Sequence, residues 1–247
     1  MGILEQAPVA RRQMVLFFVV DTSGSMHGEK MGGVNQAIRE VIPMLDEISA
    51  NNADAEIKIA ALKFSSGCEW MYDEAKSASD FIWQDVEAGG LTDLGETCKE
   101  LSTKLSRSTF MESITGSFAP VIILLSDGEP TDDYMGGLGK LRENKWYQAG
   151  IKIAIAIGND ANKDVLKEFT GNMEAVIEVH NVEALKKLIR TVSVTASQIG
   201  SQSSVAGNKD KQEQVIEKVT EDVADTQGAS SSAAPSTDPV DDDDDWD

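Results

Sequence analysis

Three hydroxyl side chains and a carboxylate are crowded into a short polar stretch that follows a run of apolar residues. The apolar run is Met14–Val20, and the polar stretch reads DTSGS from Asp21 to Ser25. A second carboxylate, Asp127, follows another apolar run, Val121–Leu125. Carboxylate and hydroxyl oxygens are ligands of hard divalent cations, and Mg²⁺ takes about six such oxygens. These residue types therefore point to a cation site.

The spacing of these residues predicts that their side chains meet. In doubly wound sheets, ligands bind beyond the carboxyl ends of the strands, near the point where the strand order reverses. If the two apolar runs are neighbouring strands, Asp21 and Asp127 lie at one edge of the sheet. Ser23 and Ser25 alternate with Asp21, so one loop can aim all three oxygens at one point, and Gly24 lets that loop bend tightly. Two carboxylates and several neutral hydroxyls would only partly neutralise the charge of a bound ion. The ion could therefore bind an anionic ligand from another molecule.

Each of these residues also has a purely structural interpretation. The Asp21–Ser25 stretch could be a helix N-cap or an Asx turn, although either needs only one such residue. In a later segment, GGLTDLG at Gly89–Gly95, Thr92 alone would cap the helix expected from Leu94, and Asp127 with Gly128 alone would be a plain turn. Asp93 could steady the loop beside Thr92 as a hydrogen-bond acceptor, or it could be a solvated loop acid.

Short apolar runs predict the strands, and amphipathic spacing predicts the helices between them. The expected strands are Met14–Val20, Ile57–Phe64, Cys68–Tyr72, Val121–Leu125, Ile151–Ile157 and Ala175–Val179, the second and third forming a hairpin. The expected helices are Gly33–Ala50, Leu94–Leu105, Asp133–Ala149, Lys163–Phe169 and Val182–Ile199. Pro43 predicts a kink or break in the first helix. The alternation predicts a doubly wound α/β fold: a mostly parallel central sheet of about six strands, with one antiparallel edge, flanked by helices.

The composition changes along the chain and predicts three segments. We expect a lead-in over residues 1–12, one domain over 13–199, and an acidic, largely disordered tail over 200–247. The tail begins with a weakly amphipathic segment, Gln212–Val223, and continues into GASSSAAPSTDP and VDDDDDWD. Low hydrophobicity combined with high charge is typical of disorder.

The charge of the chain limits its partners. The formal net charge of the 247 residues is −20, and half of it lies in residues 209–247. Such a chain is a poor ligand for nucleic acid or anionic membranes, because phosphate groups bind Lys and Arg. We expect a soluble, cytoplasmic protein, since the sequence shows no signal peptide and no apolar run near the ~18 residues of a membrane span. Its two cysteines, Cys68 and Cys98, predict neither a disulfide framework nor a zinc cluster.

The polar stretch after the first strand resembles the DxSGS motif of von Willebrand factor type A (VWA) domains. That motif is one part of their metal-ion-dependent adhesion site (MIDAS). The family pattern continues with a threonine in a later loop and an aspartate after a central strand. Here GGLTDLG, at Gly89–Gly95, supplies Thr92, and LLSDGEPTD supplies Asp127. All three parts occur in the family's order, and the resemblance covers about residues 13–199.

The resemblance implies a role for each matched residue. The hydroxyls would bind the metal directly, and the two aspartates would bind it directly or through water. The implied metal ligands are Asp21, Ser23, Ser25, Thr92 and Asp127, with Asp93, Gly24 and Glu129 around them in the second shell or on the rim. Mg²⁺ is the expected ion, with Mn²⁺ as an alternative and Ca²⁺ favoured less. A Glu or Asp of a partner protein would complete the coordination.

Within the family, GGLTDLGE and SDGEPTDDY are most similar to the bacterial tellurium-resistance-associated VWA proteins. Those proteins are associated with stress-response, kinase and phosphatase components. The resemblance therefore implies a metal-dependent protein-binding module without catalytic residues, acting in a bacterial stress-response or signalling complex. A kinase or phosphatase of the same system is one candidate partner.

Two other function classes compete with this interpretation. Asp21 and SDGEPTDD faintly resemble haloacid-dehalogenase phosphatases, but Ser23 stands where such an enzyme needs a second aspartate to protonate the leaving group. With two histidines in the chain, no Ser–His–Asp or Cys–His set is evident. In the third class, the acidic tail acts as a scaffold that binds a basic protein surface. A variant has a tail Asp occupying the protein's own metal site, which a linker of ~40 residues could reach.

Overall fold

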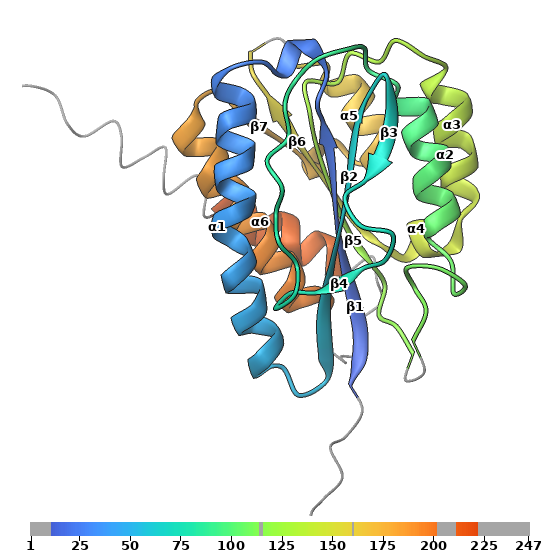
Figure 1. Ribbon diagram of the computed structural model, residues 1–247, viewed down its shortest axis with the longest axis vertical. Coiled ribbons are helices and arrows are strands. Elements are labelled where there is room, and N and C mark those ends of the chain that lie inside the picture. Colours follow the sequence, from blue (N-terminus) through green and yellow to red (C-terminus); the bar gives the residue numbers. More distant parts are fainter. Residues whose placement is uncertain (1–10, 114–115, 160, 202–210, 222–247) are drawn as a thin grey trace, which may run out of the picture.

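A computed structural model describes residues 11–113, 116–159, 161–201 and 211–221. Strands and helices alternate along most of the chain (Figure 1). The strands are β1 (Arg12–Asp21), β2 (Ala55–Ser65), β3 (Gly67–Trp70), β4 (Lys76–Ser77), β5 (Val121–Ser126), β6 (Ile151–Ile157) and β7 (Val176–Val179). The helices are α1 (Glu29–Asn51), α2 (Leu94–Lys104), α3 (Tyr134–Glu143), α4 (Lys145–Ala149), α5 (Lys163–Thr170) and α6 (Val182–Gly200). Two 3₁₀ turns, Gly24–Met26 and Met173–Ala175, lie between these elements, and residues 211–221 form a further helix.

The strands form one sheet in the order β3-β2-β1-β5-β6-β7. All neighbours in this order are parallel except β2 and β3, which form the predicted antiparallel hairpin. The short β4, which the sequence analysis did not predict, pairs antiparallel with the other half of β2. The chain moves from β1 to one side for β2 and to the other side for β5, so the strand order reverses at β1. The predicted doubly wound, mostly parallel α/β fold is confirmed.

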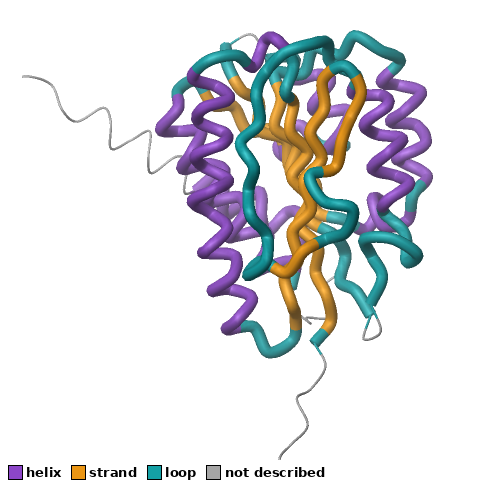
Figure 2. The backbone as a smooth tube through the Cα atoms, viewed as in Figure 1, coloured by secondary structure: helices purple, strands orange, loops and turns teal. Residues whose placement is uncertain are grey.

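Helices cover both faces of the sheet, as the tube in Figure 2 shows. Helices α1 and α6 pack together on one face, whereas α2, α3, α4 and α5 lie on the other. Alternate residues of β1 enter the two cores: Leu16 and Phe18 face the α1–α6 side, and Phe17 and Val19 face the α2 side. Because both faces are buried, β1 is a continuous apolar run rather than an alternating one.

One helix prediction is narrowed and one needs correction. The first helix continues through Pro43, so a break is excluded and a kink stays a prediction. Pro43 is exposed, so the carbonyl that loses its N–H partner can bind water. The helix predicted over Asp133–Ala149 is two helices. Asn144 separates them, because its side-chain oxygen accepts hydrogen bonds from Trp146 and Tyr147 and thereby starts α4.

The chain after α6 is described only in part. Residues 211–221 form a helix that overlaps the weakly amphipathic segment Gln212–Val223 predicted from the sequence. Its Val215, Ile216 and Val219 are buried in the core that α1 and α6 share with the sheet. Residues 202–210 and 222–247, which include most of the predicted tail, lie outside the described residues. The division of the chain at 199/200 remains a prediction. In the described ranges, no helix is long and apolar enough to span a membrane.

Candidate metal centre

Asp21 is the last residue of β1, and its carboxylate is fully buried. Its Oδ1 accepts a hydrogen bond from the backbone N–H of Ser23 (2.8 Å), and its Oδ2 accepts one from the Ser126 hydroxyl (2.6 Å). Burial raises the pKa of Asp21 above its ordinary value of 3.8; the hydrogen bonds oppose the rise, and the nearby Asp127 carboxylate adds to it. A cation beside Asp21 would stabilise its charged form.

The loop after β1 brings two hydroxyls together. The side-chain oxygens of Ser23 and Ser25 lie 3.0 Å apart, with Ser23 buried and Ser25 exposed. The backbone N–H of Gly24 donates to the carbonyl of Gly90 (3.1 Å), which ties this loop to the one that precedes α2. The two hydroxyls therefore lie on a fixed turn that runs from the buried interior to the surface.

Asp127 follows β5 directly and carries a buried carboxylate without hydrogen bonds. It is 2% exposed, and neither of its carboxylate oxygens has a hydrogen-bond partner among the described residues. The Lys30 ammonium lies 3.5 Å from its Oδ2, which is an ion-pair distance without hydrogen-bond geometry. A buried charge costs free energy unless it is paired and hydrogen-bonded. The Asp127 oxygens therefore present unused ligand capacity at the edge of the sheet.

The backbone around Asp127 is held by its neighbours. The carbonyl of Asp127 accepts a hydrogen bond from Asn162 (2.7 Å), and the N–H of Gly128 donates to the Ser126 hydroxyl (2.8 Å). Gly128 has a φ of 75°, and a Cβ there would lie 2.7 Å from the Asn162 carbonyl oxygen. Glycine is therefore favoured at this position, and the two hydrogen bonds hold the backbone that carries Asp127.

Thr92 belongs to the loop before α2, and it is buried against the loop after β5. Its N–H donates to the Thr131 hydroxyl (3.0 Å), and its carbonyl accepts from the Thr131 N–H (2.9 Å). Gly90, which binds Gly24, is two residues before it. Hydrogen bonds on either side of Thr92 thus connect it to both aspartate-bearing loops, and all three loops lie at the same end of the molecule (Figure 1).

Acidic residues around these loops bind backbone amides. Asp132 accepts from the N–H groups of Gly95 and Glu96, both at 2.9 Å, and so caps α2. The alternative in which Thr92 caps this helix is therefore wrong. Asp93 accepts from the Gly67 N–H (2.7 Å), which agrees with its interpretation as a residue that steadies the loop. Glu129 is exposed.

The sequence analysis missed three residues that shape the site. Ser126 orients Asp21, Lys30 pairs with Asp127, and Thr131 holds Thr92. Only Ser126 had a sequence signal, since it stands between the apolar run of β5 and Asp127. Lys30 lies in the first turn of α1 and Thr131 in a loop, and their proximity to the site depends on how the chain folds.

The donor set fits a hard divalent cation. Two buried carboxylates and nearby serine and threonine hydroxyls lie where the strand order reverses, which is the position expected for a ligand in this fold. No cluster of three or more His, Cys, Asp or Glu side chains that could hold a metal occurs in the part of the chain that the structure describes. A cation here would therefore depend on hydroxyl ligands in addition to the two aspartates.

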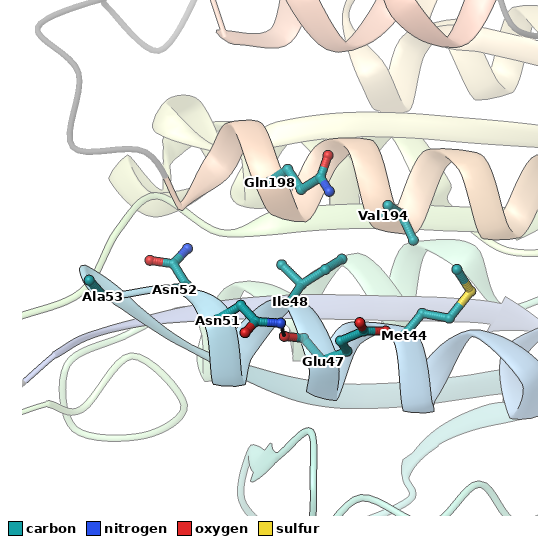
Figure 3. A pocket seen from close by; sticks show the side chains of 8 residues that line it. All are labelled: Met44, Glu47, Ile48, Asn51, Asn52, Ala53, Val194 and Gln198. Carbon is teal, nitrogen blue, oxygen red and sulfur yellow. Dashed lines mark hydrogen bonds between the residues drawn. The ribbon is translucent and has the colours of Figure 1, made fainter.

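A different hollow, at the opposite end of α1, lacks this chemistry. It measures about 570 Å³ and lies between the end of α1 and α6 (Figure 3). Met44 and Ile48 face Val194 and Gln198 across it, and Glu47 is the one carboxylate among the residues that line it. An isolated exposed carboxylate among apolar and amide side chains is a poor metal site.

Comparison with known proteins gives one family. The family model of the von Willebrand factor type A domain matches residues 16–191. Among curated proteins, inter-alpha-trypsin inhibitor heavy chain H2 of Mus musculus is 25% identical over 169 residues, which is 66% of this chain and 17% of that protein. The collagen alpha-6(VI) chain of Mus musculus is 23% identical over 193 residues, which is 75% of this chain and 8% of that protein. This chain thus spans less than a fifth of the length of these relatives.

Solved structures share the fold. A von Willebrand factor type A protein from Catenulispora acidiphila superposes with a TM-score of 0.56 at 18% identity, covering 76% of this chain and 43% of that one. Proximal thread matrix protein 1 from the mussel byssus, with a zinc-occupied MIDAS motif, gives a TM-score of 0.54 at 17% identity, covering 76% of this chain and 50% of that one.

Proposed function

Since this chain belongs to the von Willebrand factor type A domain family, we propose that it is a metal-dependent protein-binding module. VWA domains occur in adhesion and protein-interaction proteins, and they commonly bind a divalent metal at the MIDAS. In this proposal the cation lies between the loops after β1 and β5 and binds an acidic side chain of a protein partner.

The residues that would hold the cation are those predicted from the sequence: Asp21, Ser23, Ser25, Thr92 and Asp127. Mg²⁺ is the ion we propose, since it prefers oxygen ligands and retains open positions for an external ligand. The cation would supply a positive charge that two carboxylates and neutral hydroxyls do not saturate. Asp93, Gly24 and Glu129 would position the surrounding loops or form the rim.

The observation that supports this proposal most strongly is that the Asp127 carboxylate is buried without hydrogen bonds to the described residues. It lies beside a second buried carboxylate. A merely structural aspartate at a strand end would be expected to accept hydrogen bonds from the following turn. A cation at this point would satisfy both acids together.

Two segments of the chain are the basis for the biological process that we propose. GGLTDLGE and SDGEPTDDY are similar to segments of bacterial tellurium-resistance-associated VWA proteins. This similarity supports a role in a stress-response or signalling complex, with a kinase or phosphatase of that system as a candidate partner. We propose no catalytic residue, because Ser23 replaces the second acid that a phosphatase of the competing class requires.

A selection from a displayed peptide library tests the proposal. The wild type and the double variant Ser23→Ala/Ser25→Ala are each used to select peptides with Mg²⁺ and with EDTA. We expect peptides that contain Asp or Glu to be enriched by the wild type only when Mg²⁺ is present, and not by the variant. Equal enrichment of acidic peptides in EDTA, or equal enrichment by the variant, would overturn the proposal.

A further inference from the structure

A groove beside the metal loops is lined by carboxylates. It measures about 640 Å³, and its walls are the β2–β3 hairpin, the segment 85–87 and the first turn of α2. The acidic residues that line it are Glu69, Asp85, Glu87 and Glu96, and the one cationic residue among its lining is Lys63. We call it the acidic groove.

The acidic groove adjoins the proposed metal centre through Thr22. Thr22 lines the groove and lies between the proposed ligands Asp21 and Ser23 in the chain. Its N–H and its hydroxyl both donate to the carbonyl of Phe64, at 2.7 and 3.0 Å, which fixes the metal loop against β2. A partner segment with one side chain at the metal can therefore place a neighbouring side chain in the groove.

The charges in the groove are only partly paired. Glu69 forms an ion pair with Lys63 (2.9 Å), and Asp85 pairs with Arg39. No ion pair within the described residues involves Glu87 or Glu96, and both are exposed. Glu96 also acts on Cys68 of the groove wall: the pKa of this thiol is raised to about 11, chiefly by burial and further by Glu96 and by Glu100, which lies outside the groove lining.

Neighbouring walls hold the unpaired acids in place. Asn35 of α1 clamps the segment before Glu87: its side-chain amide donates to the carbonyl of Val86 (2.9 Å), and its side-chain oxygen accepts from the Val86 N–H (3.0 Å). Asp132 holds the backbone of Glu96 (2.9 Å). The backbone that carries Glu87 and Glu96 is therefore held in place on the walls of the groove, and pockets of this size accept a side chain.

We propose that the acidic groove receives a lysine or arginine side chain of the partner whose acid binds the metal. The partner element would thus carry an acid with a base close to it, either in sequence or on one surface. This inference rests on the proposed function. It adds that the partner is recognised by a basic residue close to its metal-binding acid. A partner in which the metal-binding acid is flanked by other acidic residues would be repelled by Glu87 and Glu96. The groove would therefore disfavour such partners.

The test uses peptide selection with a matched pair of variants. The displayed peptides carry a fixed central Asp and random flanking residues, and selection is done in Mg²⁺ and in EDTA. The groove variant is Glu87→Gln/Glu96→Gln. The control variant is Glu47→Gln/Glu143→Gln, which makes the same change in net charge at exposed positions outside the groove. None of these four residues is a proposed metal ligand.

We expect the wild type and the control variant to enrich Lys and Arg near the fixed Asp in Mg²⁺. The groove variant should retain Mg²⁺-dependent selection and lose the preference for Lys and Arg. For the most enriched peptide, changing its basic residue to Gln should weaken binding to the wild type at least about fivefold and binding to the groove variant less than about twofold.

The outcomes separate this inference from the function on which it rests. Mg²⁺-dependent selection of Asp peptides without a preference for Lys or Arg would overturn the inference and leave the proposed function standing. The same preference in the groove variant would also overturn it, since the base would then bind elsewhere. Absence of any Mg²⁺-dependent selection by the wild type would overturn the proposed function and this inference together.

Discussion

At the residue scale, the two aspartates of the proposed metal centre are prepared in different ways. Hydrogen bonds from Ser23 and Ser126 orient Asp21, one to each of its carboxylate oxygens. Asp127 has no such bonds among the described residues, and the Lys30 ammonium compensates its charge from 3.5 Å. One acid is thus fixed in position and the other is left to bind, so a cation would gain most from Asp127.

The reactivity of Cys68 depends on its burial and on the charge of Glu96 in the acidic groove. Its pKa is raised to about 11 from an ordinary value of 9.0, chiefly by burial and further by Glu96. At pH 8 the thiolate fraction of Cys68 is therefore about 100-fold lower than that of a cysteine with the ordinary pKa. A more basic thiolate is more nucleophilic, which raises the alkylation rate again by about tenfold. We predict that iodoacetamide alkylates Cys68 about tenfold more slowly than a free cysteine, measured by mass spectrometry of the labelled peptide.

A comparison variant separates the two causes of this shift. Glu96→Gln should speed the alkylation of Cys68, because it removes one of the charges that oppose thiolate formation. Cys98 is buried and supplies an internal reference that should remain unlabelled while the protein is folded. Alkylation of Cys68 at the rate of a free cysteine would contradict the raised pKa, and an equal rate in Glu96→Gln would show that the charge of Glu96 does not contribute to it.

At the element scale, the loop after β5 organises the start of α2. Asp132 accepts hydrogen bonds from Gly95 and Glu96 and lies thirty-six or more residues further along the chain. We predict that Asp132→Ala lowers the free energy of unfolding by about 1–2 kcal/mol, because it removes a cap and a negative charge from the helix N-terminus. Urea unfolding measures the effect.

Two further variants check the origin of that loss. Asp132→Asn keeps one acceptor oxygen and should lose roughly half as much stability. Glu129→Ala changes an exposed acid of the same loop and should leave the unfolding free energy unchanged. If Asp132→Ala proves as stable as Glu129→Ala, the hydrogen bonds to α2 contribute nothing measurable.

The pattern of apolar residues predicted most elements because burial controls them. Strands β1, β5 and β6 are largely apolar, without a regular alternation of polar residues, since both faces of the sheet are covered. The failures lie where a single polar contact decides the structure. Asn144 divides the predicted helix by capping α4 and by donating its amide to the carbonyls of Ser102 and Leu105, and neither contact can be read from local spacing.

The candidate site shows the same division between local and long-range information. The spacing of the DTSGS stretch and the position of Asp127 after an apolar run were sufficient to predict which acids and hydroxyls would share one edge. Lys30 and Thr131 could not be predicted, because each contacts the site from an element whose position depends on the packing of the whole domain.

At the scale of the whole molecule, the chain after α6 adds to the domain core. The 211–221 helix buries Val215 and Val219 against the core shared by α1, α6 and the sheet. We predict that Val215→Ala and Val219→Ala each lower the free energy of unfolding by about 1–3 kcal/mol, through lost apolar burial and the cavities left behind. Thermal or urea unfolding measures this change.

The matched control is Glu217→Ala, an exposed position of the same helix. It should leave the unfolding free energy within about 0.5 kcal/mol of the wild type. If both valine variants match this control, the burial of Val215 and Val219 does not contribute measurably to the stability of the domain.

The central claim is that a divalent cation binds between the loops after β1 and β5. Its most direct test is thermal melting of the wild type and of Ser23→Ala/Asp127→Ala in EDTA, Mg²⁺ and Mn²⁺. A cation that binds only the folded state at 100 times its Kd adds about 2.7 kcal/mol, which for a domain of this size raises Tm by roughly 5–10 °C. We predict a rise of this kind in the wild type and none in the variant. No rise in the wild type at millimolar metal, or an equal rise in the variant, would contradict the account.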